Sequence, residues 1–273
     1  MKKLLGLMVG FLMFLAGPAY ALTITPTSDS ATLVGSLLGS GISVISSSFN
    51  GASGSAGLFS GAGDAIGINS GIILTNGQAS LAVGPNNDSD AGQDNSFAGS
   101  TTLDALIPGY STNDATILDI VFTSDTGNLF FNFVFASEEY NEWVGSEYND
   151  VFGFFLDGTD IALLPNGSPV SINNVNLDAN PSYYVNNSGV ASPADIQYDG
   201  FTTVLTAQAL GLSAGQHTIS LQIADAGDYV LDSAIFLQGG SFGGDDPNPV
   251  PEPSTLLLVG AGLLGLFGLR RKA

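Results

Sequence analysis

Apolar residues gather in short blocks along this chain, and the two clearest blocks lie at 130–136 and 151–156. Each block is rich in Phe and Val, has the length of a strand, and is bounded by polar residues. Continuous apolar runs of this kind indicate strands that are buried on both faces of a sheet. Weaker runs of the same type predict further strands at 66–75, 116–123, 161–164, 170–177, 201–205, 217–225 and 232–238.

The spacing of these runs, with turn residues between them, predicts an all-β protein with an antiparallel, jelly-roll-like β-sandwich. Turn residues at 76–77 and 125–128 are typical of hairpins. A short helix is expected at 30–38, where apolar residues recur at helical spacing after polar residues that can cap it. A second helical turn is expected at 104–106, and the Asn-rich stretch 183–198 is expected to be a surface loop.

The two ends of the chain differ from its body. Residues 1–21 have a basic start, an apolar middle and the small-residue pattern Ala19-Tyr20-Ala21, which are typical of a secretory signal peptide. The body is then expected at 22–240, followed by a flexible linker at 241–249. The apolar run at 256–269 and the basic end after it predict a transmembrane helix. We therefore expect export through the Sec pathway, with the body held outside the inner membrane.

Charge is distributed very unevenly along the chain. Its 273 residues include 25 Asp and Glu but only five Lys and Arg, with a formal net charge of -20. The basic residues all lie in the terminal segments, so that only His217 can carry a positive side chain between Lys3 and Arg270. A body of this kind excludes nucleic acid as a partner. The absence of Cys excludes disulfides, thiol catalysis and thiolate metal sites.

Carboxylates cluster beside the two strongest apolar runs and again near the end of the body. Without Lys or Arg as partners, such groups are solvated, protonated at a raised pKa, or bound to a cation. Hard oxygen ligands suit calcium best, and we expect Ca²⁺ as the cofactor. Loops that are distant in sequence meet at the end of a sandwich. The candidate ligands are Glu138, Glu139, Asn149, Asp150, Asp225, Asp228 and Asp232.

A second oxygen-rich loop lies at 85–95. It places Asn86, Asp88, Asp90 and Asp94 so that several oxygens could face one centre, which makes it a second candidate metal loop. A solvated turn accounts for this pattern equally well. For the larger set, the alternative is an acidic surface on which Asp residues only cap turns.

The remaining functional hypotheses concern sugars. Tyr140, Trp143 and Tyr148 are interleaved with acidic residues and predict a sugar contact by ring stacking, unless Trp143 packs over a sheet edge. Glycosidase chemistry would use Glu138 or Glu139 with Asp150 or Asp225, but nothing in the sequence sets their separation. We therefore expect no enzymatic activity. His217 is expected to be an ordinary strand residue, because no serine-hydrolase motif accompanies it.

The C-terminal tail, VPEPSTLLLVGAGLLGLFGLRRKA at 250–273, resembles the PEP-CTERM sorting signal. The resemblance implies a Gram-negative bacterium that makes exopolysaccharide. It also implies processing by an exosortase, with transient anchoring in the inner membrane by the C-terminal helix. Pro251, Glu252 and Pro253 would then form the processing signal.

The body resembles the choice-of-anchor L domain through motifs that follow one another along most of its length. They include SGIILTNG at 70–77, FVFASEEYNEWVGSEYNDVFGFFLDG at 133–158 and IADAGDYVLDSAIFL at 223–237. The resemblance implies a secreted or surface β-sandwich without established catalytic activity. The leading hypothesis is an exported, calcium-stabilised module of the cell surface or extracellular matrix, associated with exopolysaccharide and biofilm. A carbohydrate-binding module is the alternative.

Overall fold

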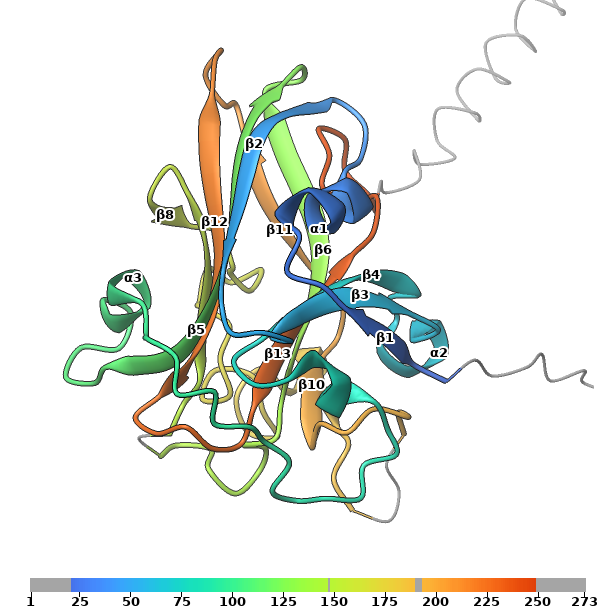
Figure 1. Cartoon of the computed structure of the whole chain (residues 1–273), viewed down its shortest axis with the longest axis vertical. Helices are drawn as coiled ribbons and strands as arrows, with labels where there is room; N and C mark the ends of the chain where they lie inside the picture. The colour runs from blue at the N-terminus through green and yellow to red at the C-terminus, as the bar shows by residue number, and fades with distance from the viewer. Residues whose placement is uncertain (1–20, 147, 190–192, 249–273) are drawn as a thin grey trace, which may run out of the picture.

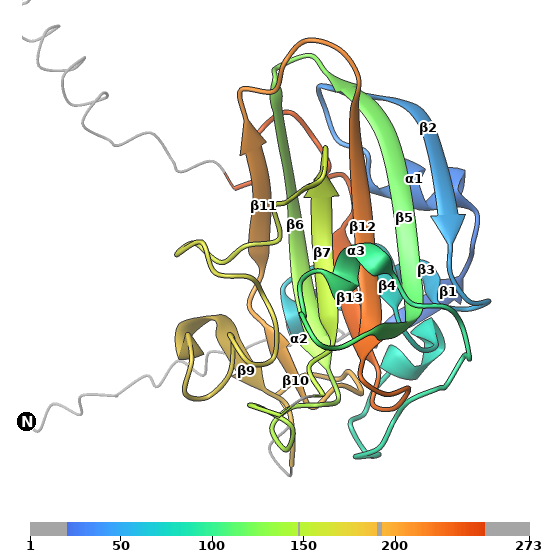
Figure 2. The same ribbon diagram turned by 90° about the vertical axis from the view of Figure 1, so that its left-hand side faces the viewer.

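The computed structural model describes residues 21–146, 148–189 and 193–248. Within these ranges the chain forms two antiparallel sheets that face each other, which confirms the predicted β-sandwich (Figures 1 and 2). Residues 1–20 of the expected signal peptide, the sorting residues 251–253 and the apolar run 256–269 lie outside the described residues. In the described ranges, no helix is both long and apolar enough to cross a membrane.

The larger sheet is built around β6 (Asn128–Ser137). Its spatial order is β1 (Thr23–Pro26), β3 (Ala56–Ser60), β4 (Ser70–Thr75), β13 (Ser233–Gln238), β6, β10 (Gly200–Thr202) and β9 (Tyr184–Asn186). β11 (Leu205–Leu210) pairs with the first half of β6. The smaller sheet has the order β2 (Ile42–Asn50), β5 (Thr112–Ser124), β12 (His217–Ala226), β7 (Val151–Leu156) and β8 (Thr159–Asp160).

Short helices cover the edges and outer faces of these sheets. They are α1 (Ser30–Leu37), α2 (Gly63–Ile66), α3 (Thr101–Asp104) and the 3₁₀ turns η1 (Ala79–Ala82) and η2 (Pro181–Tyr183). The helix expected at 30–38 is confirmed as α1, and the Asp29 carboxylate caps it by accepting from the Thr32 N–H at 3.1 Å. Leu33 and Leu37 are fully buried, which holds α1 against the core.

The core is a layer of Phe rings between the sheets. β6 and β7 lie in different sheets, and their rings meet across the gap: Phe133 contacts Phe154 at 5.0 Å and Phe135 stacks on Phe152 at 4.9 Å, measured between ring centroids. Every β7 residue is buried, and so is all of β6 after Asn128. The prediction that both runs are buried on both faces is therefore confirmed.

Burial on both faces of the larger sheet requires a second, outer apolar layer. Val134 and Phe236 point into this layer, where they meet Ile196 and Tyr198. The expected surface loop at 183–198 is therefore wrong in part, because its apolar residues close over the sheet and it contributes the short strand β9.

Three other expectations about connections are wrong. Strands β5 and β6 lie in different sheets, so the turn at 125–128 crosses the sandwich instead of closing a hairpin, and the segment between β12 and β13 crosses in the same way. After Asn76-Gly77 the chain enters η1. Residues 170–177 form turns, not a strand; Val170, Ile172 and Val175 are buried against the core, whereas Leu177 is exposed.

The linker expected at 241–249 begins later than predicted. Phe242 is fully buried, and its ring packs against Phe122 at 5.5 Å and Phe131 at 5.6 Å. The next residue, Gly243, exchanges two backbone hydrogen bonds with Phe130 at 2.8 and 3.0 Å. Burial of one aromatic ring thus makes this Gly-rich stretch part of the fold.

Candidate functional site: a buried carboxyl cluster

Three connections meet at one end of the sandwich. They are the segment between β6 and β7, the segment between β12 and β13, and the long segment after β4, all at the lower end in Figures 1 and 2. The Glu138 N–H donates to the Asp232 carbonyl at 3.1 Å, and the Ala226 N–H donates to Asp150 Oδ1 at 3.2 Å. The approach of the two acidic loops, inferred from the sequence, is therefore confirmed.

Five carboxyl groups at this end of the sandwich are buried together. We call them the acidic cluster: Glu138, Glu139, Asp150, Asp225 and Asp232, none of which is more than 2% exposed. The described part of the chain contains no Lys or Arg. Its single His lies elsewhere, bonded to Asp157. Buried carboxylates are normally paired with a base or a metal, so this arrangement is unusual.

Asn76 is the side chain that joins members of the cluster. Its amide Nδ2 donates to Asp150 Oδ2 at 2.7 Å and also donates to Asp225 Oδ1. Its Oδ1 accepts from the Ser233 N–H at 2.7 Å, which holds the amide in this orientation. Two carboxyl groups are therefore held around a single neutral donor.

Several buried oxygens in this region have no hydrogen-bond partner. Both oxygens of Glu138, Glu139 Oε1, Asp225 Oδ2 and the hydroxyls of Tyr198 and Ser233 are in this state. Each such atom is costly, because burial removes its water without a replacement. The cluster therefore has fewer hydrogen-bond donors and cations than its buried oxygens require.

The pKa values of these carboxyl groups follow from that shortage. Burial, with the Asp199 charge second, raises the pKa of Glu138 to about 9. Burial raises the pKa of Asp232 to about 7, although it accepts backbone hydrogen bonds from Gln93 and Gln78. The pKa values of Glu139, Asp150 and Asp225 are also raised, by burial first and by neighbouring acidic charges.

In the described residues, no group of three or more acidic or His side chains is arranged to hold a metal ion by itself. Any cation here would therefore combine one or two carboxylates with amide, hydroxyl or main-chain oxygens. Calcium accepts six to eight oxygen ligands of these mixed types in flexible geometry, whereas Mg²⁺ requires a near-ideal octahedron. The types of oxygen present at this end of the sandwich are therefore those that calcium binds.

Two protein-family models match this chain. Residues 23–243 match the choice-of-anchor L domain. The chain belongs to the choice-of-anchor L domain family. Residues 249–272 match the PEP-CTERM protein-sorting motif, which marks a protein that an exosortase processes and that is exported to the surface of a Gram-negative bacterium. No match was found among curated proteins or solved structures.

Two predicted ligands of this choice-of-anchor L domain lie at the rim of the acidic cluster. Asp228 is partly buried, and its Oδ1 accepts from the Val230 N–H at 3.4 Å. Asn149 turns away, since its Oδ1 accepts from the Asn173 N–H at 3.3 Å. Neither residue makes a direct hydrogen bond to a cluster carboxyl group in the described chain.

The loop at 85–95 does not gather its four predicted ligands at one point. Asn86 Nδ2 donates to Asp199 Oδ1 at 2.6 Å, and the Asp88 carbonyl accepts from Gln197 Nε2 at 2.7 Å. Asp90 and Asp94 are exposed, and the carboxylate of Asp94 caps its own turn at Ser96. The loop is thus bonded to the fold through Asn86, Gln93 and Asn95, while the Asp90 and Asp94 side chains face solvent.

Sequence reasoning missed three residues of this end. Asn76 stood in an Asn-Gly pair that is typical of hairpins, and Asp199 and Asp114 had no acidic neighbours in sequence to mark them. Asp114 is 1% exposed with φ of 49°, and its carboxylate accepts the N–H groups of Asn95 and Phe97. Gly77, the residue after Asn76, must lack a side chain, because a Cβ there would overlap the Asp232 carboxylate.

Only part of the predicted sugar contact lies at the surface of this domain. Tyr140 is fully buried and its hydroxyl donates to the Val175 carbonyl at 2.7 Å, so its expected role as an exposed stacking ring is wrong. Trp143 is 39% exposed and meets Tyr148 edge to face, with ring centroids 5.2 Å apart. Two aromatic rings therefore remain at the surface.

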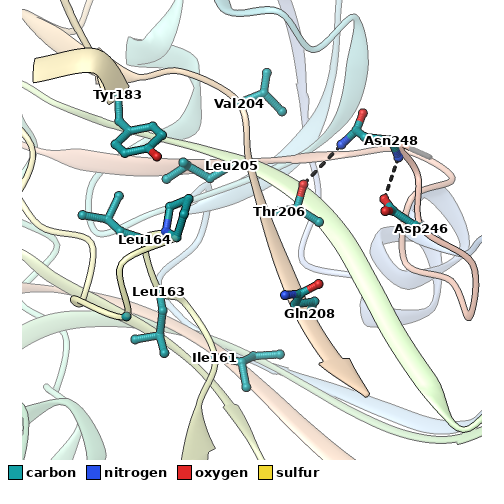
Figure 3. Close-up of a pocket in the computed structure, with 12 residues that line it drawn as sticks. Ile161, Leu163, Leu164, Tyr183, Val204, Leu205, Thr206, Gln208, Asp246 and Asn248 are labelled. Atoms are coloured by element: carbon teal, nitrogen blue, oxygen red, sulfur yellow. Dashed lines mark hydrogen bonds between the residues drawn. The ribbon is translucent and has the colours of Figure 1, made fainter. Parts of the chain in front are cut away.

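A groove of about 590 Å³ lies along β11, away from the acidic cluster. Apolar residues of 161–165 and β11 line it together with Asp246 and Asn248, as Figure 3 shows. Asn248 Nδ2 donates to Thr206 Oγ1 at 3.2 Å, and the Asn248 N–H donates to Asp246 Oδ1 at 2.8 Å. No carboxyl group of the acidic cluster lines this groove.

Proposed function

We propose that this choice-of-anchor L domain is a non-enzymatic module of the cell surface or extracellular matrix, that calcium binding stabilises it, and that it associates with exopolysaccharide in a biofilm. The observation that carries the calcium part is the pair of partnerless oxygens, Glu139 Oε1 and Asp225 Oδ2, in fully buried carboxyl groups with no base nearby. A divalent cation supplies the missing charge and the missing contacts at once.

The calcium position that we propose lies between Glu139 Oε1 and Asp225 Oδ2, beside Asp150 and its Asn76 hydrogen-bond donor, and we call it the inner centre. Glu139 Oε2 accepts from the Asp150 N–H at 3.1 Å, so the chain itself holds two of its acidic members together. Protonation is the other way to neutralise the cluster, and the two compete for the same oxygens. Calcium affinity should therefore weaken as pH falls.

Burial also argues against a glycosidase. Such an enzyme needs two carboxyl groups on either side of a sugar in an open cleft. Every member of the acidic cluster is at most 2% exposed, and none of them lines the groove along β11. A binding or structural role fits the family assignment, which suggests a non-enzymatic surface protein.

Thermal unfolding of the full chain after treatment with chelator tests the calcium proposal. Calcium at a hundred times its dissociation constant should add about 2.7 kcal/mol per site. For a domain of this size that corresponds to a rise of about 5 to 10 °C in the melting temperature. Magnesium at equal concentration should give much less. A melting temperature that is the same with calcium and with chelator would refute the proposal.

The surface rings support the exopolysaccharide part. Trp143, with Tyr148 against its edge, presents apolar ring surface next to the exposed Glu142, which suits stacking on a sugar with hydrogen bonding beside it. Retention on a column of the host polysaccharide should fall in Trp143→Ala and stay unchanged in Tyr229→Ala, an exposed aromatic residue of another loop. Equal retention of Trp143→Ala and the parent chain would remove this contact.

A further inference from the structure

The two adjacent glutamates after β6 face different surroundings. Both lie in the turn that follows Ser137: the Glu139 carboxylate accepts from the Asp150 N–H at 3.1 Å, whereas the Glu138 carboxylate makes no such bond. The acidic charges that act on Glu139 are those of Asp150 and Asp228, whereas those that act on Glu138 are Asp199, Asp232 and Asp88. Glu138 therefore stands outside the inner centre.

Glu138 is the least satisfied carboxyl group of the cluster. It is 1% exposed, and neither of its oxygens has a hydrogen-bond partner in the described chain. Protonation alone would not satisfy it, because a neutral carboxyl group still needs an acceptor for its O–H and a donor for its carbonyl. The nearby Tyr198 hydroxyl, buried at 2% exposure, also lacks a partner.

The groups around Glu138 are held in place by neutral amides. Asn86 Nδ2 donates to Asp199 Oδ1 at 2.6 Å and to the Asn187 carbonyl at 3.1 Å. Gln197 Nε2 donates to the Asp88 carbonyl at 2.7 Å and to Asn86 Oδ1 at 3.3 Å. Carboxylate, amide and carbonyl oxygens are thus positioned by their neighbours, as in the outer shell of a metal site.

Two segments far apart in sequence meet there. The segment after η1 contributes Asn86 and Asp88, and the segment leading into β10 contributes Gln197 and Asp199. Both run at the lower end of the molecule in Figure 1. A shared cation would fasten both segments to the end of β6.

We propose that a second calcium ion binds between Glu138, Asp199 and the loop at 85–95, separately from the inner centre, and fastens that loop to the sandwich. This outer centre rests on the proposed function for the identity of its ion. It differs from a loop that binds calcium by itself, because Glu138 and Asp199 supply carboxylates from outside the loop.

Calcium stoichiometry of the full chain, measured by isothermal titration calorimetry after chelator treatment, tests this proposal. We expect two ions for the parent chain, one for Glu138→Gln and one for Asp225→Asn. Asp178→Asn, an exposed removal of charge in another segment, should keep two. Both site variants keep side-chain size and remove a buried charge, and far-ultraviolet circular dichroism verifies their fold.

Hydrogen exchange of the amides at 86–95 separates the two centres. Calcium should slow this exchange in the parent chain and in Asp225→Asn, but not in Glu138→Gln or Asp199→Asn. No binding by the parent chain would refute the proposed function itself. One ion that Asp225→Asn removes and Glu138→Gln keeps would leave the proposed function standing and overturn the outer centre. Loss of both ions in Glu138→Gln would show one shared site and also overturn it.

Discussion

Asp157 and the acidic cluster contain the same kind of group in opposite situations. The Asp157 side chain is 51% exposed and accepts from the Thr218 N–H at 2.9 Å, while His217 Nδ1 lies 2.6 Å from its second oxygen. Slight burial raises its pKa, but the Thr218 and His217 hydrogen bonds outweigh this and leave it lowered. The pKa values of the cluster are all raised, because burial there meets no base.

The comparison shows that partners, and not the number of carboxylates, decide the charge state. The only His of the chain is paired at the exposed site, where a salt bridge is worth least. The buried site, where an unpaired charge costs most, has only the Asn76 amide between two of its members. On the proposed function, solution cations supply the charge that this end of the fold lacks.

The pH dependence of stability should show the largest effect. In the metal-free chain, carboxyl groups with raised pKa values bind more protons when folded than when unfolded, so stability falls as pH rises. The fall begins near pH 4 and continues through about 7 for Asp232 and about 9 for Glu138. One unit of pKa shift corresponds to about 1.4 kcal/mol, so the loss should reach several kcal/mol.

Urea unfolding in chelator at pH 5 and pH 8 measures this loss. The His217 pair adds a smaller slope of the same sign, because a raised His pKa gives stability that disappears as pH rises above it. Asp157→Asn should remove the pH dependence that comes from His217 and leave the pH dependence that comes from the acidic cluster. Saturating calcium should flatten the slope, and greater stability at pH 8 than at pH 5 in chelator would contradict the prediction.

Asp225→Asn should change stability with opposite signs in the two conditions. In chelator the variant should be at least as stable as the parent chain, since it removes a buried carboxyl group with a partnerless oxygen. In calcium it should lose the contribution of the inner centre, about 2.7 kcal/mol at a hundred times the dissociation constant. Thermal unfolding with and without calcium checks both signs. Asp178→Asn, an exposed change, should show neither. Destabilisation of Asp225→Asn in chelator alone would show that the carboxylate is structural without metal.

Asp157→Asn should have the smallest effect on stability, below about 1 kcal/mol, because exposed ion pairs are screened by solvent. Its clear effect should be on His217, whose pKa is raised by the hydrogen bond to Asp157 and should fall towards its usual value. NMR titration measures this directly, since the chain has a single His. Asp125→Asn, an exposed change in another turn, should leave that pKa unchanged, and an unchanged pKa in Asp157→Asn would disprove the pairing.

The sequence predicted the parts of the fold that depend on local pattern. The runs that became β6 and β7 and the spacing that became α1 all follow from which side chains need burial. Partnering between sheets was not predictable in this way, because turn residues mark where the chain reverses and not which sheet the next strand joins. The crossings after β5 and after β12 are examples.

The site was predictable to the same degree and for the same reason. The absence of Lys and Arg made clustered acids informative, so the acidic members were found by charge alone. Asn76 is neutral, and its role depends on β4 ending beside β13, a long-range pairing that no local pattern shows. Tyr140 was misjudged because acidic neighbours in sequence suggested exposure, whereas its ring turns inward against Tyr184, with centroids 4.7 Å apart.

The burial of Phe242 has a mechanical consequence. Its N–H donates to the Leu37 carbonyl at 3.0 Å, its carbonyl accepts from the Gly39 N–H at 2.8 Å, and Gly243 is bonded to Phe130 on β6. A force applied to the chain beyond Asn248 therefore reaches the helix near the N-terminus and the central strand of the larger sheet together. Tension at this end is shared across the sandwich instead of peeling one edge strand from it.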